Sequence, residues 1–265
     1  MSYPMLILLV FLFLAVSTIF SMMGQGGGAF YVPMLLAVSV PFYVAASTSQ
    51  ILIVVVSLSS LLIFARHGML DWNLVLLIEP PTNLGSFLGG YLSAYIPPDV
   101  ARLCFAGVLL IGAHFMYRPI RGHAPSKPDG HWWNWNRTDV AEPYAINMLA
   151  LVPVMILGGF VAGMLGVGGG LVKVPAMVLL GGVPMAIAVG SSSLMVGATA
   201  LTGLIGHLLQ GHLDLHLAIS LAAGVLVGSQ IGPRFSVKTD RSRLKRYFAF
   251  LMLAIAVWMV YGVVR

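Results

Sequence analysis

The sequence predicts an all-α polytopic membrane protein made of two inverted repeats of about five transmembrane segments each, with glycine-rich helix breaks near the midplane. Of the 265 residues, 59% are hydrophobic and 8% are charged, and the mean hydropathy is +0.96. An ordinary soluble domain carries about 25% charged residues. Apolar stretches follow one another along the chain, and a glycine motif of the first half recurs in the second. These observations exclude a soluble fold.

The apolar stretches predict the helices, because a membrane-spanning helix needs about 20 apolar residues. The long stretches are Met5–Met23, Val44–Ala65, Trp72–Tyr95, Val100–Tyr117, Tyr144–Leu165, Met185–Leu208, Leu213–Pro233 and Tyr247–Val264. The first stretch has neither a basic start nor a cleavage pattern, so we expect a retained helix rather than a signal peptide. Two shorter pieces, Ala29–Val40 and Leu171–Val183, each follow a glycine cluster and are expected to be half-helices or broken crossings.

Residues 118–143 are rich in proline, glycine, histidine, tryptophan and charge, and they separate the first repeat (1–117) from the second (144–265). We interpret them as a cytoplasmic linker. Trp132, Trp133 and Trp135 could form a binding platform, but tryptophans beside a membrane more often anchor the chain at its interface. The single Cys104 lies in an apolar run, where helix packing is the simplest role, and one cysteine cannot form a disulfide framework.

The repeat is carried by Gly24-Gln-Gly-Gly-Gly28 followed by Pro33, which recurs as Gly166-Val-Gly-Gly-Gly170 followed by Pro175. After one inserted residue the register continues, so that Asp71 aligns with Asp214. Duplication explains this match.

If the short segments count as crossings, each half has five, and the linker face carries most of the lysines and arginines, as the positive-inside rule requires of the cytoplasmic face. An odd number per half would invert the second repeat, a plan common in secondary transporters.

Consecutive glycines predict a site for an anion. Three glycines in a row cost about 1 kcal/mol each in helix propensity, so each cluster is expected to interrupt a helix. The following half-helix then starts with unpaired N–H groups, which bind anions. Close packing of helices through small residues is the competing explanation.

Hydroxyl clusters at the start of the next helix, including Thr48 and Ser192, could coordinate substrate oxygens, although such hydroxyls also cap helices or bond to their own backbone.

Two charged residues lie inside apolar segments. Lys173 follows the second glycine cluster, where it could attract an anion or extend to the membrane interface; Tyr31 is its neutral counterpart. Glu79 precedes Pro80 and Pro81, which we expect to interrupt the helix. Glu79 could carry a proton, or it could accept hydrogen bonds from donors that the prolines free.

The candidate substrate-binding residues are Gln25, Gly26, Gly27, Gly28, Tyr31, Ser47, Thr48, Ser49, Gln50, Gly168, Gly169, Gly170, Lys173, Ser191, Ser192 and Ser193. Glu79 is the candidate for proton coupling. His67, His114 and His207 lie near helix ends and could titrate, but each more often has a structural role. No spacing of histidines and carboxylates resembles a metal site, and we expect no cofactor.

The two glycine motifs, each followed by a small-residue and hydroxyl cluster, resemble the TauE/SafE family of sulfite exporters, also called four-toluenesulfonate uptake permeases. The resemblance covers nearly the whole chain outside the linker. It implies secondary transport of sulfur-containing anions such as sulfite or organosulfonates, often as export and coupled to protons, in a bacterial inner membrane. Gln25 departs from the pattern, since an apolar residue is usual there, and the linker is longer than expected; both leave the substrate open.

The sequence therefore predicts a transporter with alternating access, in which the two halves rock about a central site. A passive anion channel, or a receptor working through residues 118–143, is the alternative. An enzyme is not expected, because no nucleophile and base stand at a recognisable spacing. The expected partners are a small anion and the lipid bilayer, nucleic acid is not expected, and a homo-oligomer is left open.

Overall fold

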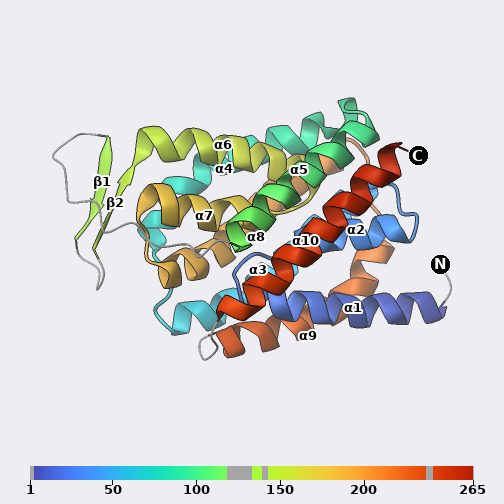
Figure 1. Cartoon of the computed structure of the whole chain (residues 1–265), viewed down its shortest axis with the longest axis horizontal. Coiled ribbons are helices and arrows are strands. Elements are labelled where there is room, and N and C mark those ends of the chain that lie inside the picture. The colour runs from blue at the N-terminus through green and yellow to red at the C-terminus, as the bar shows by residue number, and fades with distance from the viewer. Residues whose placement is uncertain (1–2, 118–132, 139–142, 237–240, 265) are drawn as a thin grey trace.

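The computed structural model describes residues 3–117, 133–138, 143–236 and 241–264. These residues form ten α-helices and a two-stranded antiparallel hairpin (Figure 1). The helices are α1 (Tyr3–Ser21), α2 (Gly28–Ala37), α3 (Phe42–Arg66), α4 (Trp72–Leu92, extended by a 3-10 turn over Ser93–Tyr95), α5 (Pro98–Tyr117), α6 (Met148–Leu165), α7 (Gly170–Gly181), α8 (Met185–Leu209), α9 (Leu215–Ser236) and α10 (Arg241–Val264). The hairpin pairs β1 (Asn134–Arg137) with β2 (Tyr144–Asn147). The all-α prediction is confirmed.

The two short helices begin at the glycine clusters, so the predicted helix breaks are confirmed. α1 ends at Ser21 and α2 begins at Gly28, while α6 ends at Leu165 and α7 begins at Gly170. In Figure 1, α2 extends toward the end of the molecule that holds both termini, whereas α7 extends toward the hairpin. At about 1.5 Å per residue, each short helix covers roughly half of a hydrocarbon core about 30 Å thick.

The first helix of each half packs along the fourth helix of the other half. α1 lies against α9, and α6 lies against α4. Glycines bring these backbones into contact: a Cβ on Gly89 would lie 1.9 Å from the carbonyl oxygen of Phe160, and a Cβ on Gly232 would lie 2.0 Å from that of Thr18. Small residues allow such close approach between membrane helices. The packing units therefore mix the two halves, which the sequence did not predict.

The third helices, α3 and α8, pack against each other, and α5 pairs with α10. The largest cluster of buried apolar side chains includes Phe13, Leu35, Phe105, Leu221 and Met252, from five different helices of both halves. The largest cluster thus joins the two halves around the glycine clusters, and two smaller clusters lie beside it.

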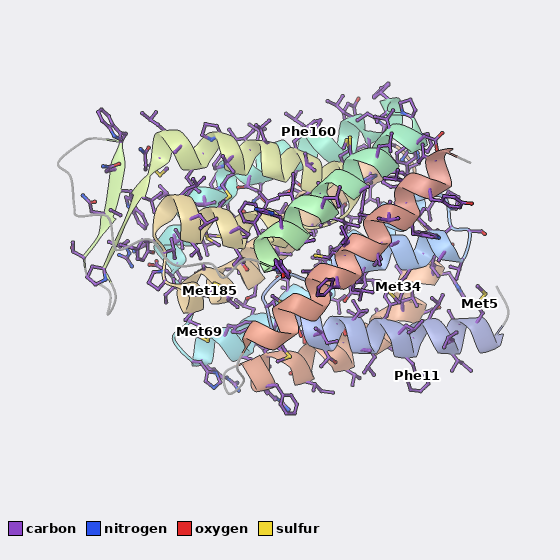
Figure 2. The ribbon with its side chains drawn as sticks, in the orientation of Figure 1. Met5, Phe11, Met34, Met69, Phe160 and Met185 are labelled. Carbon is purple, nitrogen blue, oxygen red and sulfur yellow. The ribbon has the colours of Figure 1, made fainter. Side chains whose placement is uncertain are left out.

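The outer surface is rich in large apolar side chains. Phe11 is 66% exposed and points away from the bundle in Figure 2, and Leu76 is 69% exposed. Five described helices, α3, α5, α6, α8 and α9, are long and apolar enough to cross a membrane. The chain is a multi-pass membrane protein.

Pro80 and Pro81 do not interrupt α4, so the prediction of a break at these residues is wrong. α4 is continuous from Trp72 to Leu92. Each proline removes a backbone donor and crowds the preceding turn, but α6 and α8 pack along this helix and hold it in one piece.

The start of the second half also differs from its prediction. Tyr144–Asn147 was expected to belong to a transmembrane helix, but these residues form β2. The helix begins afterwards because the Asn147 side chain caps α6, accepting a hydrogen bond of 3.2 Å from the amide of Ala150.

Candidate functional site

The two glycine clusters adopt the same backbone conformation. Each has three glycines in the left-handed region, where other residues are strained. The φ angles are 65°, 76° and 88° at Gly24, Gly26 and Gly27, and 74°, 73° and 81° at Gly166, Gly168 and Gly169. The left-handed residue just before each short helix ends the irregular segment and lets α2 or α7 begin at the following glycine.

The two clusters lie against each other inside the molecule. A Cβ on Gly28 would lie 2.7 Å from the carbonyl oxygen of Val167, and a Cβ on Gly170 would lie 2.7 Å from the Cα of Gln25. No side chain fits between the two backbones at these points. The amino-terminal ends of α2 and α7, each with its partial positive charge, therefore meet at the centre.

The same pair of side chains packs on both clusters. A Cβ on Gly26 would lie 2.9 Å from Ile53 and from Val196, and a Cβ on Gly168 would lie 3.0 Å from the same two residues. Ile53 lies on α3 and Val196 lies on α8, at aligned positions of the repeat. The contacts of one cluster are thus repeated in the other.

Each short helix begins with backbone amides that are free of hydrogen bonds. Among the hydrogen bonds between described residues, none is donated by the amides of Gly27, Gly28 and Ala29, or by those of Gly169, Gly170 and Leu171. Neither helix has a side-chain cap. Unpaired amides at a buried helix start need a partner, and an anion is a suitable one.

Two of the predicted hydroxyls connect the glycine clusters to the opposite half. Ser49 Oγ donates to the carbonyl oxygen of Gly166 at 2.6 Å, and Ser192 Oγ donates to that of Gly24 at 2.7 Å. The sequence aligns Ser49 with Ser192 and Gly24 with Gly166. These serines position the clusters rather than offering a free hydroxyl.

The other predicted polar residues divide into two groups. Ser47 and Ser193 donate to carbonyl oxygens of their own helices, and Ser191 Oγ accepts from the amide of Asp71 at 3.0 Å. The second group has buried oxygens without a hydrogen-bond partner among the described residues: Gln25 Oε1, Thr48 Oγ1 and Gln50 Oε1. These three oxygens therefore keep unused hydrogen-bonding capacity inside the molecule.

Lys173 and Glu79 form a buried ion pair, which the sequence did not predict. Lys173 Nζ lies 2.8 Å from both carboxylate oxygens of Glu79 and 2.9 Å from the carbonyl oxygen of Met195. It also donates to Thr199 Oγ1, whose hydroxyl donates to Glu79 Oε1 at 3.1 Å. Lys173 is 2% exposed, so it does not extend to the membrane interface, and Glu79 is 5% exposed.

Tyr31 takes the corresponding place in the first half without a charge. Its ring lies over Gly27, since a Cβ there would be 2.6 Å from the ring, and it stacks on Phe13 with the ring centroids 4.8 Å apart. A Cβ on Gly169 would similarly lie 3.5 Å from Lys173 Cε. Tyr31 and Lys173 therefore lie over equivalent glycines in opposite halves.

His207 is fully buried beside the predicted residue Gln50. Its Nε2 lies 3.0 Å from the carbonyl oxygen of Gly163, which also accepts from Gln50 Nε2 at 2.8 Å. Its Nδ1 lies 3.2 Å from Ser93 Oγ. Both ring nitrogens have partners, so His207 fixes the end of α8 against α4 and α6.

Sequence reasoning missed Thr199 and the partnership of Lys173 with Glu79. The pair could have been inferred, because charged groups at membrane depth usually pair with one another. No signal marked Thr199, because threonine is common in membrane helices and its role depends on the packing of α8 against α4 and α7.

Comparisons with known proteins identify the family of this chain. The family model described as Sulfite exporter TauE/SafE matches residues 8–259. The chain belongs to the TauE/SafE family. It is 26% identical to the "Probable membrane transporter protein YunE" of Bacillus subtilis (strain 168), over 96% of this chain and 97% of that protein. It is also 26% identical to the "Probable membrane transporter protein YdhB" of the same organism, over 95% and 98%. No solved structure matches significantly.

This TauE/SafE protein is thus a membrane transporter. The match covers both glycine clusters, the ion pair and nearly all described helices, so the central arrangement belongs to the part of the chain that defines the family.

Proposed function

We propose that the protein is a secondary transporter, working by alternating access, of a small sulfur-containing anion such as sulfite or an organosulfonate, with export as its direction and protons as the coupling ion. The observation that carries this proposal is the meeting of two buried helix starts with free amides beside the Lys173–Glu79 pair. The same proposal places the protein in a bacterial inner membrane as two inverted repeats, 1–117 and 144–265, joined by a cytoplasmic linker. It does not require catalysis.

The free amides supply the binding groups for the anion. Sulfite and sulfonates present several oxygens, which suit a cluster of N–H donors at helix starts. We propose that Gly26, Gly27 and Gly28 contribute these donors from one half, and Gly168, Gly169 and Gly170 from the other. Gln25 Oε1, Thr48 Oγ1 and Gln50 Oε1, which lack a partner among the described residues, complete the proposed site when it opens, together with Tyr31 and the serines of α3 and α8.

The ion pair supplies the coupling. With Glu79 ionised, the pair has no net charge, and Lys173 is fully engaged. A proton on Glu79 would leave the positive charge of Lys173 uncompensated in a buried site, where an uncompensated charge is costly. An entering anion restores neutrality. Proton and anion therefore bind together and move together, and export runs down the gradient of an anion that accumulates in the cell.

The test uses the full chain reconstituted in liposomes, with isethionate as the first substrate. A sulfonate stays ionised across the pH range, so flux driven by a pH gradient cannot be leakage of the neutral acid. We expect acid outside to drive isethionate into the vesicles. Sulfite, sulfoacetate, taurine and sulfate then define the substrate range.

Two variants examine the ion pair. Glu79→Gln should carry the anion down its own gradient but no longer respond to a pH gradient, and Lys173→Gln should lose anion binding. Asp99→Asn and Arg102→Gln are matched controls, because exposed Asp99 and half-buried Arg102 form an ion pair, 3.6 Å apart, away from the proposed site. Proton-driven flux in Glu79→Gln would make Glu79 structural, and wild-type flux that is rapid and independent of pH gradients would indicate a channel.

A further inference from the structure

Asp71, just before α4, binds four groups from the hairpin and from its own helix. Its carboxylate accepts from Tyr144 at 2.7 Å and from Arg137 Nε at 3.1 Å. It also caps α4 by accepting from the amides of Asn73 and Leu74 at 3.0 and 3.2 Å. Arg137 and Tyr144 are directly paired across β1 and β2. One carboxylate therefore links both strands of the hairpin to the start of α4, in addition to the buried apolar cluster that Tyr144 and Ile146 share with Leu74.

The same residue connects the hairpin to the centre of the molecule. The amide of Asp71 donates to Ser191 Oγ on α8, and the next residue, Ser192, donates to the carbonyl oxygen of Gly24 in the first glycine cluster. A continuous series of contacts thus runs from Arg137 through Asp71 and α8 to the proposed anion site.

The opposite end of the molecule lacks this arrangement. Asp214, aligned with Asp71 in the repeat, is exposed; its side chain accepts from the amide of Leu217 at 2.9 Å. It lines a cavity of about 520 Å³ together with His216 and Ser220. Thr48, the counterpart of Ser191, has no hydrogen-bond partner among the described residues. The contact between Asp71 and Ser191 is therefore made at one end only.

We infer that the contact of Arg137 and Tyr144 with Asp71 is a gate that closes the linker end of the transporter. This inference rests on the proposed alternating access. The hairpin leaves Asp71 when the linker end opens, and Asp214 closes on Thr48 at the other end in the same step. Through Arg137, the segment that the sequence predicts as a linker thereby acquires a function in transport.

The charge state of Asp71 fits a gate that stays locked at neutral pH. Burial by itself would raise the pKa of Asp71, but hydrogen bonds from Tyr144 and Arg137, with that from the amide of Leu74, outweigh it and lower the pKa below its usual range. The carboxylate remains ionised when a proton reaches the ion pair at the centre. Gate opening follows from substrate-driven movement and not from titration of the gate.

The test fastens the gate reversibly and leaves Asp71, Arg137 and Tyr144 in place. Asn73 and Asn136 line one cavity between α4 and the hairpin, and both are exposed. Asn73→Cys and Asn136→Cys would be combined on a Cys104→Ser background and joined by a cleavable bifunctional thiol reagent. We expect isethionate flux to fall to background when the cysteines are linked and to recover on cleavage. Undiminished flux in the linked protein overturns the gate, whereas absence of isethionate flux in the protein without any substitution marks failure of the proposed transport function.

Amide hydrogen exchange provides a second measurement that needs no cross-link. Arg137→Gln should accelerate exchange in β1 and β2 by about tenfold or more, since local opening then requires fewer broken contacts. Asp99→Asn, at a surface ion pair, is the matched control and should leave the hairpin unchanged. Equal rates of amide exchange in Arg137→Gln and in the wild type would contradict the proposed gate.

Discussion

The two glycine clusters share a backbone but differ in chemistry. Both have three left-handed glycines, and both are packed against Ile53 and Val196. In the first half, Tyr31 lies over the cluster and stacks on Phe13; in the second, Lys173 takes that place and pairs with Glu79. The comparison teaches that a duplicated fold can repeat a backbone motif while only one copy places a charged side chain over it. The proposed coupling site is therefore single, although the proposed anion-binding amides occur twice.

The largest change in the free energy of unfolding should come from replacing Lys173, the charged residue that lies over the second glycine cluster. Lys173→Met leaves the Glu79 carboxylate buried without its cation, which typically costs about 3–5 kcal/mol. The double variant Lys173→Met/Glu79→Leu should recover most of that loss, because apolar residues often replace a buried pair without penalty. The free energy of unfolding in mixed micelles measures both. Isethionate flux should be absent in both, and a double variant as unstable as the single one would contradict this account.

A smaller loss of stability should follow from replacing a left-handed glycine in either cluster, and the loss should be equal in the two halves. Gly26→Ala and Gly168→Ala each place a Cβ about 3 Å from Ile53 and Val196 at positive φ. Left-handed strain of about 1–2 kcal/mol then adds to overpacking of about 1–3 kcal/mol. Thermal unfolding in detergent measures the loss.

Gly68→Ala and Gly211→Ala are the matched controls for these two variants. Both glycines have positive φ, and a Cβ on either would meet nothing within 4 Å. These two variants introduce backbone strain without overpacking, so they should lower the unfolding temperature less than Gly26→Ala and Gly168→Ala. Clearly unequal losses at Gly26 and Gly168 would show that the two clusters are not mechanically equivalent.

The serines that connect the halves should have a smaller, matched effect. Ser49→Ala and Ser192→Ala each leave a buried glycine carbonyl oxygen without its donor, at a cost of about 1–3 kcal/mol. Ser47→Ala and Ser193→Ala remove hydroxyls that only bond to their own helices, and these controls should change unfolding much less. If all four variants unfold alike, the connections across the halves contribute little.

The smallest effect on stability should come from a change at Tyr31, the uncharged residue that lies over the first glycine cluster. Tyr31→Phe keeps the ring that stacks on Phe13 and removes a buried hydroxyl that has no hydrogen-bond partner among the described residues. It should change the free energy of unfolding by less than about 0.5 kcal/mol, the lower end of the net contribution of a hydrogen bond. Its hydroxyl lies beside Gly27 and the free amides, so anion affinity measured by calorimetry should still fall severalfold. Unchanged affinity would remove Tyr31 from the proposed site.

Local features of the fold could be predicted from the sequence. The helices follow from apolar length, and the two breaks follow from consecutive glycines, since both signals act within a single segment. The continuous helix through Pro80 and Pro81 could not be predicted in this way, because α6 and α8 hold it together from outside. Tertiary packing here outweighs a local propensity.

The site could be predicted in its parts but not in its connections. Lys173 and Glu79 were recognised separately, yet they belong to different halves and meet only because α7 and α8 pack on α4. Ser49 and Ser192 were predicted as candidate substrate ligands, but the hydrogen bond that each makes to a glycine of the opposite half could not be predicted. Sequence reveals which polar groups lie in the membrane, but the register between distant helices decides what each one contacts.

The exchange of first helices between the halves has a consequence for how the chain is made. α1 enters the membrane early, but its packing partner α9 is synthesised only near the end of the chain. In the interval α1 lacks this partner and has only helices of the first half beside it, such as α2, whose Tyr31 stacks on Phe13. Its polar side chains do not depend on α9, because Ser17, Thr18 and Ser21 all bond to carbonyl oxygens of their own helix. The packing of α1 is therefore completed only after nearly the whole chain has been made.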